Sequence, residues 1–195
     1  MIDEFRTIKD KSEGTYSELR SKFLAFAHHV TSVEEAMSLV EQYQKQYYDA
    51  RHVCWAYMIG PEREIFRSND NGEPSGTAGK PILGQINSNE LTDIIILVVR
   101  YFGGVKLGTS GLIVAYKTAA AEAIANAEIE TRTVDEEYTF SFEYPLMNNV
   151  LKVARDMGAR IVSQSYDMDC KMTLSVRRGK MQELQDKIRK ALSPF

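Results

Sequence analysis

The alternation of apolar and polar residues predicts a sheet in the first two thirds of the chain. Residues 52–59 alternate regularly, and both faces of the strand they predict are fairly apolar, so we expect it to be an inner strand. Residues 64–68 are expected to form a hairpin with it. Residues 93–101 are apolar on both faces, which is typical of a strand covered from both sides, and residues 21–30 have the composition of a further strand.

Apolar residues at steps of three or four predict helices between these strands. The first helix is expected over residues 31–48, where Ser32 and Glu35 have the spacing of a capping box. A short helix is expected over residues 78–86. A third, rich in alanine and therefore able to pack closely, is expected from about Ser110 to Ala127.

The pattern restarts after about residue 130 and predicts a second, smaller domain of βαββα order. We therefore expect two α+β domains, over residues 1–130 and 137–195. A basic turn at residues 177–180 is interpreted as solvated surface or as a phosphate contact. The expected elements are a strand with Tyr138, Phe140, Phe142 and Tyr144 on one face, a helix over 146–157 ended by Gly158, strands over 160–166 and 170–176, and a helix over 180–192.

Composition and charge exclude several classes of protein. The 24 basic and 27 acidic residues give a net charge of −3, so bulk positive charge cannot hold a nucleic acid. The longest apolar run, residues 94–99, is far shorter than a membrane span, and the acidic N-terminus is unlike a signal peptide. We expect a cytoplasmic protein in which Cys54 and Cys170 are lone buried residues, with a single disulfide as the alternative.

The strongest local signal is the glycine-rich turn between the apolar strand and the third helix. Glycines let backbone N–H groups converge, and a helix N-terminus adds partial positive charge, so the turn predicts an anion or phosphate site. A tight structural connection is the alternative interpretation. The spacing matches neither a Walker loop nor a dinucleotide fingerprint. The candidate phosphate-binding residues are Arg100, Gly103, Gly104, Lys106, Gly108, Thr109 and Ser110.

A second signal is the long loop over residues 69–81, which is dense in turn formers. Two carboxylates separated by a turn are a weak metal signature, so we expect no metal and no cofactor. Ser75 or Thr77 is expected to cap the following helix. The residue types of a hydrolase triad are present, with His52 oriented by Asp70, but their spacing does not support one. The residues of this possible loop site are His52, Asp70, Glu73, Ser75, Thr77 and Lys80.

Three segments together resemble the YigZ/IMPACT family. They are residues 70–83, residues 100–112 with Ala115-Tyr116 behind them, and His52 with Cys54-Trp55-Ala56-Tyr57; Ser21-Lys22-Phe23 adds an early strand. Ser110 stands where the family usually has glycine. The resemblance implies a first domain similar to the second domain of ribosomal protein S5 and to domain IV of elongation factor G. It implies a second, ferredoxin-like domain similar to domain V of that factor.

The resemblance and the glycine-rich turn favour a translation-associated, regulatory protein that binds RNA or the ribosome. Lys22, Arg51, Lys80 and Lys117 are candidate charges around the site. One alternative is an enzyme that acts on a nucleotide or other phosphorylated small molecule between the two loops, although we favour a protein without enzymatic activity. Another alternative is a protein-interaction module. None of these hypotheses involves a membrane.

Overall fold

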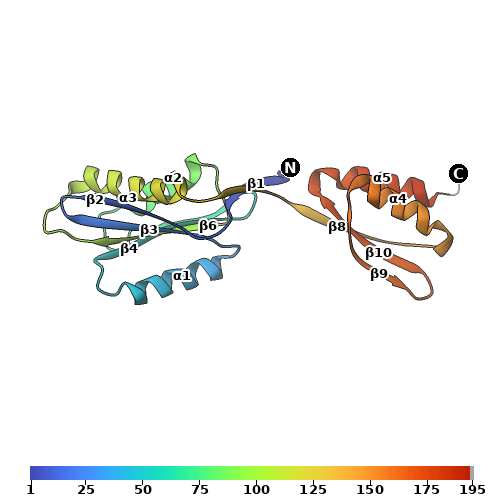
Figure 1. Ribbon diagram of the computed structural model, residues 1–195, viewed down its shortest axis with the longest axis horizontal. Helices are drawn as coiled ribbons and strands as arrows, with labels where there is room; N and C mark the ends of the chain where they lie inside the picture. Colours follow the sequence, from blue (N-terminus) through green and yellow to red (C-terminus); the bar gives the residue numbers. More distant parts are fainter. Residues whose placement is uncertain (194–195) are drawn as a thin grey trace. The chain divides into compact units, whose positions relative to one another are not determined.

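The computed structural model describes residues 1–193, which divide into two compact units (Figure 1). One unit is Phe5–Arg132. The other contains Met1–Glu4 together with the chain from Thr133 onward. The sequence pattern did not predict that the first four residues belong with the C-terminal part. That the units are independent domains stays a prediction.

The first unit is built on a five-stranded sheet in which every neighbouring pair is antiparallel. The strand predicted to be fully covered lies at its centre, and the alternating strand is an inner one, as predicted. The strands, in the order of the sheet, are β2 (Ser12–Glu18), β3 (Ser21–His29), β6 (Ile94–Tyr101), β4 (His52–Ile59) and β5 (Ile65–Asn69).

Helices cover both faces of this sheet (Figure 1). α1 (Val33–Gln46) packs on one face, and α2 (Gly79–Ser88) and α3 (Gly108–Ala125) pack on the other. Alternate residues of β6 therefore enter two different cores, which explains its unbroken apolar run. Ile95, Leu97 and Val99 face α1, whereas Ile94, Ile96 and Val98 face α2 and α3.

Local signals located the helices within a few residues. Ser32 Oγ accepts the Glu35 N–H at 3.1 Å, as a capping box requires, but the Glu35 carboxylate accepts the N–H of Thr31 at 2.9 Å instead of that of Ser32. The third helix begins at Gly108, two residues before the predicted start.

Three strands were not predicted, because their sequences are short or mainly polar. They are β1 (Glu4–Ile8), β2 and β7 (Ile129–Thr133). β1 and β7 pair with each other.

The second unit has the predicted βαββα order, which confirms a mixed α+β fold. Its sheet has the order β8-β10-β9, with both pairs antiparallel, and one core joins the sheet to the two helices (Figure 1). Tyr144 does not share the strand's face, because β8 ends at Phe142 and Tyr144 opens a short 3-10 turn with 72% of its surface exposed. The elements are β8 (Asp135–Phe142), α4 (Met147–Met157), β9 (Arg160–Tyr166), β10 (Cys170–Arg177) and α5 (Met181–Leu192).

Acidic partners occupy much of the basic turn after β10. Arg177 Nε donates to Asp3 at 2.9 Å, and Arg177 also pairs with Glu4. Arg178 Nε donates to Glu136 at 2.9 Å. These contacts hold the N-terminal residues to the second unit. Across residues 1–193, no helix has the length and apolar character needed to cross a membrane.

The two histidines at the end of β3 have separate partners. His28 Nε2 lies 2.6 Å from the Tyr43 hydroxyl, and His29 Nδ1 lies 3.0 Å from the Thr7 hydroxyl. Burial, helped by the charge of Lys11 and opposed by that of Glu13, lowers the pKa of His28 below its ordinary value of 6.5. The folded protein therefore favours the neutral imidazole.

This lowered pKa predicts a pH dependence of stability. Below pH 6.5 the unfolded chain takes up a proton on His28 more readily than the folded protein does, so stability should fall as the pH drops from about 7 toward 5. Urea unfolding at several pH values should show a smaller fall for His28→Gln than for the unchanged protein. Equal slopes would mean that His28 titrates alike in both states.

Candidate functional site

The register of the central strands places His52 beside Arg100. Arg100 of β6 is paired with His52 on β4 and with Phe23 on β3. Because side chains alternate along a strand, all three lie on the face that α2 and α3 cover. The Arg100 guanidinium carbon lies 5.5 Å from the centre of the Phe23 ring. A fully charged side chain is thus buried at the end of an apolar strand.

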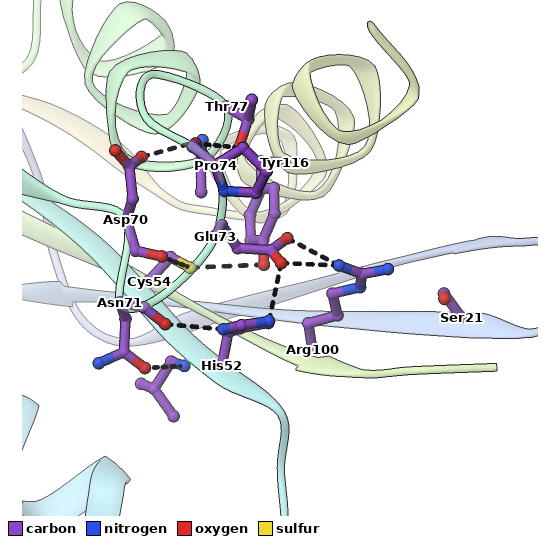
Figure 2. A network of polar contacts seen from close by, with 12 residues as sticks. Ser21, His52, Cys54, Asp70, Asn71, Glu73, Pro74, Thr77, Arg100 and Tyr116 are labelled. Carbon is purple, nitrogen blue, oxygen red and sulfur yellow. Dashed lines mark hydrogen bonds and ion pairs between the residues drawn. The ribbon is translucent and has the colours of Figure 1, made fainter. Parts of the chain in front are cut away.

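Glu73, from the loop after β5, neutralises this buried charge (Figure 2). Arg100 Nη1 donates to both carboxylate oxygens of Glu73 at 2.8 Å, and the two side chains are only 6% and 3% exposed. His52 Nε2 lies 2.8 Å from Glu73 Oε1. The sequence pattern did not predict this pairing. The signal that was available is an arginine directly after a buried apolar run, which needs an acidic partner.

Protein groups contact both nitrogens of the His52 ring. Nδ1 lies 2.7 Å from the Asn71 carbonyl oxygen, so we assign a proton to Nδ1. Nε2 lies 2.8 Å from Glu73 Oε1, which also accepts from Arg100. Both ring nitrogens are occupied by protein groups. Glu73, and not Asp70, contacts His52, so the structure does not form the triad whose residue types are present in the sequence.

Asp70 instead shapes the loop that carries Glu73. Its carboxylate accepts the backbone N–H groups of Gly76, Ala78 and Gly79 at 2.9, 3.1 and 2.8 Å. Burial pushes the pKa of Asp70 upward, but these three donors outweigh it and hold the pKa below its ordinary value. Asp70 therefore caps the start of α2 from a distance.

The prediction that Ser75 or Thr77 caps α2 is wrong. The Thr77 hydroxyl donates to the Pro74 carbonyl at 2.6 Å, inside the loop, and α2 has no capping bond from the residue before it. Ser75 is exposed. The local spacing predicted a hydroxyl cap, but the cap is the carboxylate of Asp70, which lies six to nine residues before the N–H groups that it accepts from.

Cys54 and Tyr116 lie behind the ion pair (Figure 2). Cys54 Sγ donates to the Asp70 carbonyl at 3.0 Å and lies 3.4 Å from the Tyr116 hydroxyl. Burial raises the pKa of both side chains, so the thiol and the phenol stay neutral. Cys54 and Cys170 are both buried and free, as we expected of lone cysteines.

The glycines of the turn meet structural requirements, as expected for a tight connection. A Cβ at Gly103 would lie 2.1 Å from the Arg20 carbonyl carbon, so this glycine allows close packing. Gly104 and Gly108 have φ angles of 91° and 75°, which disfavour other residues. Ser110 lies inside α3 and is not among the residues with positive φ, so serine fits where the family usually has glycine.

A pocket of about 330 Å³ lies between the two loops. Arg100, Glu73 and His52 line it together with Lys106, Gly108 and Thr109, so the structure brings residues from both predicted sites to one place. Arg51 also lines it, whereas the other candidate charges, Lys22, Lys80 and Lys117, do not. The candidates outside the lining are Gly103, Gly104, Ser110, Asp70, Ser75, Thr77 and Lys80.

The pocket is electropositive. Arg51, Arg100 and Lys106 outnumber the single carboxylate of Glu73, and the N-terminus of α3 adds unpaired N–H groups at Gly108 and Thr109. Lys106 is exposed and has no acidic partner within residues 1–193. In the same part of the chain, no three His, Cys, Asp or Glu side chains are grouped so that they could hold a metal ion.

Comparisons with known proteins identify the class to which this α+β chain belongs. The family model of the Impact N-terminal domain matches residues 19–124. The chain is therefore a member of the IMPACT family, which confirms the resemblance seen in its motifs.

Several relatives extend this similarity beyond the first unit. The chain is 33% identical to the IMPACT family member YvyE of Bacillus subtilis (strain 168) over 156 residues, which cover 80% of this chain and 72% of that protein. It is 31% identical to the IMPACT family member YigZ of Escherichia coli (strain K12) over 171 residues, which cover 87% and 84%. It also resembles the crystal structure of a hypothetical protein, with a TM-score of 0.72, 28% identity and coverage of 97% and 93%.

The buried ion pair predicts a large effect of removing its negative partner. Glu73→Gln should lower the free energy of unfolding by about 3–5 kcal/mol, because Arg100 would stay buried without a counter-charge. Glu34→Gln, on exposed surface of α1, should change it by less than about 0.5 kcal/mol. Adding Arg100→Met to Glu73→Gln should recover part of the loss. Unfolding curves that coincide for Glu73→Gln and the unchanged protein would contradict this account.

Proposed function

We propose that the chain is a translation-associated protein that binds RNA, and that its pocket receives a phosphate group of the RNA backbone. The observation that carries this proposal is the set of cations around one opening: Arg51 and Lys106 at the surface, and Arg100 beneath them. The N-terminus of α3 opens into the same pocket. Backbone N–H groups at a helix start and nearby cations are the groups that phosphate oxygens accept from.

The net charge of the chain makes a local site necessary. With a charge of −3, the protein as a whole repels a polyanion at long range, so the affinity has to come from a few contacts. The pocket concentrates three cationic side chains around one carboxylate that is already paired. RNA binding through this pocket is therefore compatible with an acidic protein.

The occupied hydrogen-bonding groups favour binding over catalysis. An enzyme acting on a phosphorylated small molecule would need a free acid or base in the pocket. Both nitrogens of His52 and both oxygens of Glu73 already contact protein groups. The titratable groups that face solvent are Arg51 and Lys106, which supply charge.

The family membership and the fold we propose for each unit support a link to translation. We propose that the first unit is similar to the second domain of ribosomal protein S5 and to domain IV of elongation factor G. We also propose that the second unit is ferredoxin-like, in the manner of that factor's domain V. The order β8-β10-β9 supports the latter, because it is the order of a split βαββα unit. Similarity of fold alone is a weak argument for function, so the proposal rests on the residues of the pocket.

Salt dependence tests the binding of phosphate. Lys106→Ala should weaken binding of a labelled oligoribonucleotide and of ribosomal subunits. It should also reduce the slope of log affinity against log salt concentration by about 0.7 to 0.9 for each phosphate that the variant no longer neutralises. Affinity measured across a series of potassium chloride concentrations gives both quantities.

Lys45→Ala is the matched control, because it removes the same charge from the exposed face of α1, where Lys45 pairs with Glu41. It should change neither the affinity nor the slope. Equally weakened binding in both variants would indicate diffuse attraction, and unchanged binding in both would contradict the proposed site.

A further inference from the structure

The pocket contains more apolar surface than a phosphate needs. Phe102, Leu107 and Leu112 line it beside the charged groups. Phosphate oxygens gain nothing from such side chains, whereas a flat aromatic ligand gains by leaving water. The lining therefore indicates a ligand with an anionic part and an apolar part.

The charged groups gather where the anionic part would lie. Gly108 and Thr109 begin α3, Lys106 precedes the helix by two residues, and Arg100 lines the same pocket. The Arg100 side chain is only 6% exposed, and its Nε is buried without a hydrogen-bond partner within residues 1–193. A buried guanidinium with an unused donor is an independent sign, besides the helix N-terminus, that this pocket is built for an anion.

Phe102 lies next to these groups, in contact with the guanidinium groups of Arg51 and Arg100. The Arg51 guanidinium carbon lies 5.3 Å from the centre of the Phe102 ring, and 40% of the Phe102 surface is exposed. Proteins that read unpaired RNA stack its bases on aromatic rings and on arginine planes. Phe102 and Arg51 are thus side chains of the types that hold a base.

From these observations we infer that the pocket takes one unpaired nucleotide, with its phosphate at the start of α3 and its base against Phe102 and Arg51. A volume of about 330 Å³ suits one small ligand, and a base within a duplex cannot enter a hollow of this kind. This inference rests on the proposed RNA binding and names its substrate class. Single-stranded RNA is therefore preferred over duplex RNA.

Competition against a labelled single-stranded oligoribonucleotide tests this inference with the full chain. Adenosine 5′-monophosphate should compete at least about fivefold more effectively than ribose 5-phosphate, because only the former has a base that stacks. A duplex of the same sequence should bind at least about fivefold more weakly than the single strand.

Thr109→Trp should abolish both preferences, because it fills the opening of the pocket from an exposed position. Val114→Trp is the matched control, since Val114 is exposed on α3 outside the pocket, and it should keep both preferences. Thermal unfolding of the two variants checks that each remains folded.

Two results would overturn the inference, and they can be told apart. If ribose 5-phosphate competes as well as the nucleotide, or the duplex binds as well as the single strand, RNA binding stands and the unpaired nucleotide is wrong. If neither RNA nor nucleotide binds the unchanged protein, the proposed function fails as well.

Discussion

The buried charge of Arg100 is the constraint on which the site depends. An arginine at the end of a fully covered strand loses its hydration, and only an acidic partner in direct contact can offset that cost. Glu73 is that partner, yet it belongs to a loop and reaches Arg100 only because the loop is folded back over the sheet. Asp70 produces this fold by accepting three backbone N–H groups, which also begins α2. One ion pair thus links the central strand, the loop and a helix.

The same contacts decide which groups can meet a ligand. His52 is held at both nitrogens, by the Asn71 carbonyl and by Glu73, so its ring is part of the pocket floor. Cys54 and Tyr116 support that floor from behind and stay neutral. Arg51, Pro74, Phe102, Lys106 and the start of α3 remain open to solvent. The side chains at the bottom of the pocket are therefore already held in place beneath the cations. Such a pocket is suited to binding, because few side chains lose conformational freedom when a ligand enters.

The sequence predicted the elements whose signal is local. The apolar run of β6, the alternation of β4, the cap at Ser32 and the glycine turn were all found, because each depends on neighbouring residues. The family followed from motifs that are contiguous in the chain. The contact of Glu73 with Arg100 was not predicted, since it depends on the register between β4 and β6 and on the path of a loop. β2 was missed because an edge strand with polar residues has no apolar pattern.

The most direct test of the central claim is to locate bound RNA on the protein. Backbone amide resonances of the isotopically labelled chain can be followed by NMR while a short single-stranded oligoribonucleotide is added. The account predicts the largest shifts at Gly108 and Thr109, where the N–H groups at the start of α3 open into the pocket, with smaller shifts at Phe102 and Arg51. Shifts confined to residues 133–193, with no change around the glycine-rich turn, would contradict it.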